Sequence, residues 1–182
     1  MKTIRNLIII LALLIAVGVE AAERVVVTFP QSFGLIYIMG LSNKIVGMPT
    51  QKLRIKNGKL SPFYLHYSPN IASATDIGFT GAVNMETLLS LNPDLVISSA
   101  NVTSSQGNTS FLRSKGIKVI ELMGGSGSVK NWLDMVKNAC NEAGVPERAE
   151  TYIKLWEKNL ALVNERLAKI PVDKRVKVTL IN

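Results

Sequence analysis

The residue types that most often carry chemistry in proteins, histidine and cysteine, occur once each in this chain, as His66 and Cys140. A site for free Zn²⁺ or a related ion needs three or four converging ligands from histidine, cysteine and carboxylate side chains. One histidine and one cysteine within a helical pattern cannot supply that set, so the sequence disfavours a receptor for a free metal ion. His66 could still ligate a metal whose other positions a chelator fills, although a surface loop histidine is the simpler interpretation.

The sequence also lacks the patterns of a catalytic site. A Ser/His/Asp set would need His66, and no nucleophile-elbow motif surrounds any serine. The glycine-rich stretch 124–128 does not continue into the Gly-Lys-Ser/Thr ending of a phosphate-binding loop, so it is better interpreted as a turn with Ser128 as a helix cap. We therefore expect a binding protein and not an enzyme.

Polar or aromatic residues follow or adjoin the apolar segments at three places, within 30–32, 79–81 and 98–101. Ligands of open α/β sheets bind beyond the carboxyl ends of the strands, which is where such loops would lie. Each place has a plain alternative. Ser32 could only cap its own helix, the loop 98–101 could be an ordinary polar loop, and Phe79 could be a core residue.

The least regular segment, residues 49–82, contains four aromatic or imidazole side chains in addition to Phe79, namely Phe63, Tyr64, His66 and Tyr67. A loop of this length in a compact domain is typically functional or disordered. Aromatic walls with a few polar groups suit a flat chelate or macrocycle. The predicted ligand-binding residues are therefore Gln31, Ser32, Tyr64, Tyr67, Phe79, Thr80 and Asn101.

Strand and helix patterns alternate along the rest of the chain, which predicts an α/β domain with a mostly parallel sheet flanked by helices. A long helix and a terminal strand follow. The expected strands are 24–29, 44–48, 94–98, 117–123 and 175–181, and the expected helices are 32–39, 85–91, 109–115, 128–143 and 147–169.

The N-terminus has the anatomy of a secretory signal peptide. Lys2 and Arg5 form a basic region, an uncharged apolar run covers 7–19, and small residues at Val19 and Ala21 fit a cleavage site. The apolar run of 13 residues is shorter than the roughly 20 that a membrane-spanning helix needs. We expect export and cleavage after residue 21, with an uncleaved membrane tether as the alternative.

The overall charge is basic, with 21 lysine and arginine residues against 13 aspartate and glutamate residues and a formal net charge of +8. No block of five like charges occurs, and a nucleic-acid-binding protein usually concentrates its charge on one stripe or arm. We therefore expect no nucleic-acid partner. A basic surface suits an anionic small ligand or an anionic membrane face equally well.

Several of these features resemble the substrate-binding proteins of ABC importers for ferric siderophores, haem and cobalamin. The most specific is a glycine, Gly78, followed by Asn84-x-Glu86-x-Leu-x-x-Leu-x-Pro93-Asp94-Leu-Val. A strand, Pro30 and a short helix ending in 40–47 precede it, and 116–120 and the long helix 147–169 follow in the expected order. The resemblance covers residues 24–182.

The resemblance implies two α/β lobes joined by one long rigid helix, with the ligand between the lobes. Residues 1–21 are then the signal peptide, 22–145 the N-terminal ligand-binding lobe, 146–170 the inter-lobe helix, and 171–182 the first strand of a truncated second lobe. It also implies an exported, periplasmic, monomeric protein that delivers a metal chelate to a permease in the inner membrane and has no intrinsic cofactor.

Two other functions stay open at this point. The chain could be a truncated interaction module that binds no ligand and only docks on a permease. It could also be one lobe of a doubly wound α/β enzyme, although the chain lacks a glycine-rich nucleotide fingerprint.

Overall fold

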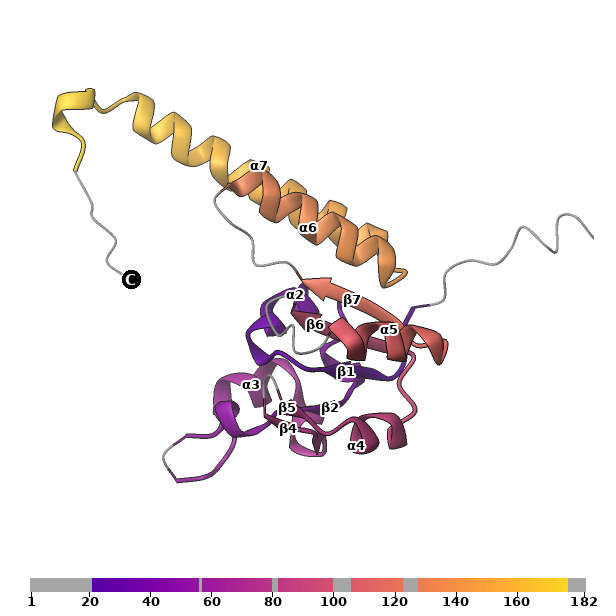
Figure 1. Cartoon of the computed structure of the whole chain (residues 1–182). Coiled ribbons are helices and arrows are strands. Elements are labelled where there is room, and N and C mark those ends of the chain that lie inside the picture. The colour runs from indigo at the N-terminus through magenta and orange to yellow at the C-terminus, as the bar shows by residue number, and fades with distance from the viewer. Residues whose placement is uncertain (1–20, 56, 80–81, 100–105, 123–127, 177–182) are drawn as a thin grey trace, which may run out of the picture.

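A five-stranded parallel sheet forms the centre of the molecule in the computed structural model, which describes residues 21–55, 57–79, 82–99, 106–122 and 128–176 (Figure 1). The strands are β1 (Val25–Val27), β2 (Ile45–Met48), β3 (Thr75–Asp76), β6 (Leu95–Ser99) and β7 (Lys118–Leu122). Their order in the sheet is β3-β2-β1-β6-β7, and every neighbouring pair is parallel. The predicted α/β fold with a mostly parallel sheet is confirmed.

The central strands consist of apolar residues because helices cover both faces of the sheet. Alternate residues of β1 contribute to two different clusters: Val25 and Val27 lie in one, and Val26 lies in the other. Successive side chains of a strand point to opposite faces, so a continuous apolar run is what a strand buried on both faces requires.

Helices form a layer on each side of the sheet. One layer contains α2 (Phe33–Ile38), α6 (Val129–Glu142) and the start of α7 (Pro146–Ala168), and it buries the lone cysteine, Cys140. The other layer contains α4 (Met85–Ser90) and α5 (Gln106–Ser114), whose Leu88 and Leu112 pack on Val26, Val96 and Val119. Short 3-10 turns cover 30–32, 42–44, 51–53, 69–72 and 172–174.

The sequence motif around α4 holds two strands in place. The Asn84 side chain caps α4 by accepting a hydrogen bond from the Thr87 N–H at 2.9 Å. The Asp94 carboxylate accepts hydrogen bonds from the backbone N–H groups of Glu23 at 2.8 Å and Arg24 at 3.1 Å, just before β1. The motif therefore ties the beginning of β1 to the beginning of β6.

The segment 49–82, which the sequence left as irregular, contains regular structure. It holds α3 (Pro62–Tyr67), the edge strand β3 and a hairpin of β4 (Gly78–Phe79) and β5 (Ala82–Val83). These elements are only two to six residues long, too short for a periodic pattern. Gly78 has a φ of +98°, and a Cβ there would lie 3.0 Å from the Ala82 carbonyl oxygen, so the hairpin requires glycine.

Helix α7 returns alongside α6 and then continues beyond it, on the side where the β7 arrow ends (Figure 1). The Trp132 indole N–H donates a hydrogen bond to the Tyr152 hydroxyl at 3.1 Å and joins the two helices. Ser128 caps α6 by accepting from the Asn131 N–H at 3.1 Å, as predicted.

The chain after α7 is not a strand in its described part. A 3-10 turn covers Val172–Lys174, and Arg175 and Val176 follow without regular structure. The remainder of the strand predicted over 175–181 lies outside the described residues. Across the described ranges, none of the helices combines the length and the apolar composition that a bilayer crossing requires.

Two glycines offer a matched test of the packing. A Cβ on Gly47 in β2 would overlap Leu91 and lie 3.1 Å from Ile77, whereas a Cβ on Gly34 in α2 would meet nothing within 4 Å. We expect Gly47→Ala to lower the free energy of unfolding by about 1–3 kcal/mol, and Gly34→Ala to raise it by about 0.5–1 kcal/mol. Urea denaturation measures both, and equal effects would contradict the close packing of β2 on Leu91.

Candidate functional site

The parallel strands end together at one edge of the sheet, and buried hydroxyl groups gather just beyond or within their last residues. Thr28 follows β1, Thr50 follows β2, Ser98 lies near the end of β6, and Ser32 lies in the 3-10 turn after β1. All four side chains are buried. We call this set the hydroxyl row, and it places uncharged donors and acceptors where ligands of such sheets bind.

Three members of the hydroxyl row have partners within the chain. The Thr28 hydroxyl donates a hydrogen bond to the Ser98 hydroxyl at 3.0 Å, across β1 and β6. The Thr50 hydroxyl donates to the Asp76 carboxylate at 2.7 Å, across β2 and β3. The neighbouring strand ends are thus linked in pairs by side chains.

Ser32 differs from the rest of the row. Only 5% of the residue is exposed, and its hydroxyl oxygen has no hydrogen-bond partner among the described residues. A buried hydroxyl without a partner costs about 1–3 kcal/mol relative to a satisfied one. The Ser32 side chain does not cap α2, so the alternative of a pure capping role is wrong.

Asp76 is the only carboxylate at the end of strands β1 to β3 that the structure describes. Burial acts to raise its pKa, but hydrogen bonds from the Thr50 hydroxyl and from backbone N–H groups, together with the charge of Arg54, lower the pKa below its ordinary value. The carboxylate therefore stays ionised and holds the loop into β4, since its Oδ1 accepts from the Gly78 N–H at 3.0 Å.

The two predicted tyrosines lie toward opposite edges of the sheet. Tyr64 packs edge-to-face against Phe33 at the start of α2, with 5.2 Å between the ring centroids. The Tyr67 backbone oxygen accepts a hydrogen bond from the Ser42 hydroxyl, which lies just before β2 begins. Tyr64 is thus near the edge where the strands end, and Tyr67 is displaced toward the opposite edge.

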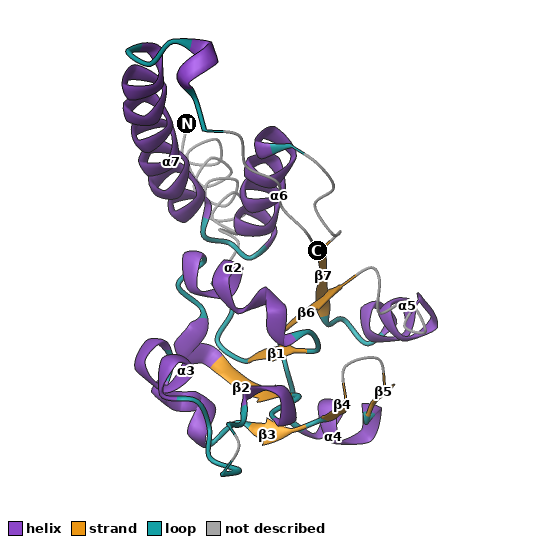
Figure 2. Cartoon of the chain, turned by 90° about the vertical axis from the view of Figure 1, so that its left-hand side faces the viewer, coloured by secondary structure: helices purple, strands orange, loops and turns teal. Residues whose placement is uncertain are grey.

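Phe79 lies on the β4–β5 hairpin, and 60% of the residue is exposed. The alternative of a core residue is therefore wrong. Figure 2 views the molecule from the side on which the β7 arrow ends in Figure 1. In this view α2 and α3 lie on one side of the strands, and the β4–β5 hairpin lies on the other side. Phe79 and Tyr64 belong to opposite borders of this edge.

The other predicted positions are less completely described. The backbone of Gln31 forms the 3-10 turn Pro30–Ser32. Thr80 and Asn101 lie outside the described residues. The structure brings Ser32 and Tyr64 to the α2 side of the edge, and it adds Thr28, Thr50 and Asp76, which the sequence did not single out. The sequence signal of Thr28 and Thr50 is a polar residue one or two positions after an apolar strand, whereas Asp76 lies within the two-residue strand β3 and has no such signal.

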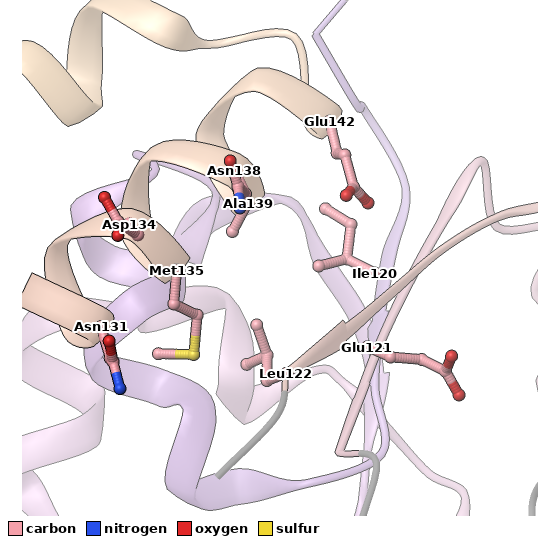
Figure 3. A pocket seen from close by; sticks show the side chains of 9 residues that line it. All are labelled: Ile120, Glu121, Leu122, Asn131, Asp134, Met135, Asn138, Ala139 and Glu142. Atoms are coloured by element: carbon pink, nitrogen blue, oxygen red, sulfur yellow. The ribbon is translucent and has the colours of Figure 1, made fainter. Parts of the chain in front are cut away.

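A separate hollow of about 340 Å³ lies between β7 and α6, and none of the predicted residues lines it. Ile120, Leu122, Met135 and Ala139 form its apolar part, while the Glu121 side chain points away from α6 (Figure 3). Glu121 instead accepts a hydrogen bond from the Thr109 hydroxyl at 2.9 Å. This hollow shares no residue with the hydroxyl row. No group of three or more histidine, cysteine or carboxylate side chains converges anywhere in the described ranges.

The hydroxyl row gives a stability test that separates Ser32 from Thr28. We expect Ser32→Ala to leave the free energy of unfolding unchanged or to raise it by up to about 1 kcal/mol, because a buried hydroxyl without a partner is removed. We expect Thr28→Val to lower it by about 1 kcal/mol, because the bond to Ser98 is lost. Urea denaturation of both variants measures the difference, and an equal loss for Ser32→Ala would show that its hydroxyl is bonded within the chain.

Many solved structures share the fold of this chain. The following three are longer than this chain. A possible iron-binding periplasmic solute-binding protein from Staphylococcus epidermidis is 19% identical with a TM-score of 0.62, and the match covers 84% of this chain and 54% of that one. The molybdate periplasmic binding protein of Haemophilus influenzae is 21% identical with a TM-score of 0.64, over 86% and 52% of the two chains. A periplasmic haem-binding protein from Pseudomonas aeruginosa is 19% identical with a TM-score of 0.58, over 81% and 47%.

The chain thus spans about half the length of the solved structures that it matches. No curated protein sequence matches it. The family model described as "Periplasmic binding protein" matches residues 25–182, which include the sheet, both helical layers and α7. The chain belongs to the periplasmic binding protein family.

Proposed function

We propose that this protein is the exported substrate-binding component of an ABC importer, and that its cargo is a metal already held by a chelator. The observation that carries the proposal is the family membership together with an edge of the sheet lined by hydroxyl and aromatic groups. Solved relatives of the fold are described as binding haem, vitamin B12 and a complex of acinetobactin with ferric iron. Those cargoes are chelated metals, which makes this class the natural one to test first.

The ligand would contact the edge where the strands end. Ser32 would donate its hydroxyl, Tyr64 and Phe79 would supply aromatic surface from the two borders, and Gln31, Thr80 and Asn101 would complete the proposed set. Tyr67, which the sequence also suggested, is left out of this set because its backbone oxygen binds Ser42, toward the edge where the strands begin. The described side chains offer no converging set of metal ligands, which supports recognition of the chelator and not of a bare ion. Membership of a family of binding proteins favours a binding protein over an enzyme.

The location and partner follow from the same proposal. Residues 1–21 would direct export and be removed, and residues 22–145 would form the ligand-binding lobe. The protein would act as a monomer outside the cytoplasmic membrane and release its cargo to a permease in that membrane.

Helix α7 would connect this lobe to a second one, to which residues 171–182 would contribute the first strand. Its far half and the residues just after it expose an apolar stripe spaced three and four residues apart, with Leu160, Val163 and Leu167 on the helix and Ile170 just beyond its end. A hollow of about 520 Å³ adjoins the beginning of that stripe, at Trp156. Exposed apolar stripes of this kind mark surfaces that another element covers, and a second lobe packed on α7 would place the ligand between the two lobes.

The cargo can be identified by titration, because Trp132 and Trp156 lie on α6 and α7 and report on this part of the molecule. We expect saturable quenching of tryptophan fluorescence by one member of a panel of a ferric siderophore, haem and cobalamin. Ser32→Ala and Phe79→Ala should weaken that binding about threefold to thirtyfold, because each removes one contact worth about 1–2 kcal/mol. Lys137→Ala, on the exposed side of α6, serves as the control.

No response from a chain whose fold is verified by circular dichroism would contradict binding by this chain alone. It would then favour an interaction module that only docks on a permease. Turnover of a ligand in the panel would favour the enzyme alternative.

The apolar stripe of α7 can be tested in the chain as it stands. We expect the double substitution of Leu160→Glu and Leu167→Glu to change the free energy of unfolding by less than about 0.5 kcal/mol, since both side chains are exposed. It should also reduce binding of the dye ANS. Ala149→Glu on the same helix, at a buried position, should unfold the protein. A loss of more than about 1 kcal/mol from the double substitution would show that the stripe already packs within this chain.

A further inference from the structure

Three aromatic rings and one imidazole ring on α2 and α3 contact one another. Tyr37 and Tyr67 are 5.0 Å apart between ring centroids, Phe63 and Tyr67 are 5.0 Å apart, and His66 and Tyr67 are 4.9 Å apart. The exposed fraction is 60% for Phe63 and 51% for Tyr37, and His66 is exposed as well. We call these four residues, Tyr37, Phe63, His66 and Tyr67, the aromatic flank. Contiguous exposed aromatic surface marks a site of interaction.

The proposed ligand does not account for this surface. Tyr67 lies toward the edge where the strands begin, as its bond to Ser42 shows. Tyr37 lies near the end of α2, which leads away from the edge where the strands end. The aromatic flank therefore begins beside Tyr64, whose ring centroid lies 5.4 Å from that of Phe63, and extends from there toward the opposite edge, away from the hydroxyl row.

The charge excess of the protein is concentrated in the same part of the chain. Residues 24–75 contain six lysine or arginine residues and no aspartate or glutamate, whereas residues 76–182 contain 13 of the former and 11 of the latter. The individual charges are dispersed, but almost all of the imbalance of the folded part lies in the segment that builds β1, α2, β2 and α3.

Three of these cations belong to the loop 54–60, which projects beside α3 (Figure 1). Lys56 lies outside the described residues, and we call the described part of this loop, residues 54–55 and 57–60, the basic finger. Its two ends approach at the Arg54–Leu60 bridge, and the Ile55 N–H donates to the Lys59 backbone oxygen at 2.9 Å. The Arg54 guanidinium donates to the Gly58 backbone oxygen at 2.7 Å. Arg54, Ile55 and Lys59 are exposed, and neither cation forms an ion pair with a described residue.

We propose that the aromatic flank and the basic finger bind the surface of a membrane that contains anionic phospholipids. Tyrosine and phenylalanine rings settle at the level of the lipid headgroups, and nearby lysine and arginine residues are attracted by the negative surface potential. The exposed Ile55 would insert beside the rings. Residues 24–75 contain no acidic residue, which limits the repulsion from an anionic surface, and the carboxylate of the next residue, Asp76, is offset by the charge of Arg54.

A membrane explains the combination better than an acidic protein does. Protein interfaces bury their aromatic residues in shaped pockets with depleted charge around them, whereas here Phe63 and Tyr37 are 60% and 51% exposed and lie on helices next to a basic loop. The rings and the cations need only a plane with negative charge, and no shaped partner. The surface would hold the protein close to the membrane without occupying the ligand edge.

The test is co-sedimentation of the full chain with vesicles of phosphatidylcholine alone and of equimolar phosphatidylglycerol and phosphatidylcholine. Because the apolar run 7–19 is present in every variant, differences between variants isolate the folded surface. We expect Arg54→Glu with Lys59→Glu to weaken binding to the anionic vesicles by about tenfold or more, since each cation contributes about fivefold. Raising the salt concentration should weaken binding of the unmodified chain as well.

Two matched controls accompany these variants. Lys137→Glu with Lys158→Glu makes the same change of net charge on exposed parts of α6 and α7 and should retain binding. Phe63→Ala should weaken binding about fivefold, whereas Phe79→Ala, which removes a ring of the same 60% exposure on the hairpin, should not.

The proposal is overturned if both charge-reversal pairs weaken binding equally, or if the anionic and neutral vesicles bind alike. Binding to immobilised polyglutamate through Arg54 and Lys59, without binding to anionic vesicles, would also overturn it and would assign the surface to an acidic protein. None of these results depends on the identity of the cargo, so the membrane-binding proposal and the ligand-binding proposal can be contradicted independently.

Discussion

Parallel strands covered by helices on both faces can present polar groups only at their ends, and this constraint shapes the whole domain. Val25, Val26 and Val27 have no exposed surface, and β6 is buried along its entire length. The chain must therefore satisfy its polar groups at two edges. At one edge the Asp94 carboxylate binds the N–H groups that precede β1, and at the other the hydroxyls of Thr28 and Thr50 link neighbouring strands. The second edge carries the uncharged hydroxyl groups, and it is the edge at which ligands of open α/β sheets bind.

The order of the elements could be predicted from the sequence because each carried a local signal. Asn84 and Ser128 stand three residues before the N–H groups they bind, and the apolar runs of β1, β6 and β7 have the length of buried strands. The same logic failed over 49–82. The edge strand β3 has two exposed residues, and α3 has six residues with none fully buried, so neither produces a periodic pattern.

The candidate site was predictable only in part, for reasons of distance along the chain. Ser32 follows an apolar strand and could be recognised as a loop residue. Thr50 and Asp76 are 26 positions apart, and only the pairing of β2 with β3 brings them together. Tyr64 and Tyr67 looked equivalent in the sequence. Because α3 runs beside α2, Tyr64 contacts Phe33 at the start of α2, and Tyr67 contacts Tyr37 near the end of α2. Neighbouring residues of a short helix can thus serve different surfaces.

Helix α7 is held to the domain at one end only, so a small rotation at that end would move the other end much further. Its first turn is fixed to the domain by the buried Ala149 and by Arg148, whose guanidinium group lies against Gly40 at the end of α2, while its far half is exposed. Twenty-three residues at 1.5 Å each make the helix about 35 Å long. A rotation of about 5° at that base would carry the far end through about 3 Å, given that length. A sub-ångström shift of Gly40 against Arg148 would therefore be magnified several-fold at the far end of the helix.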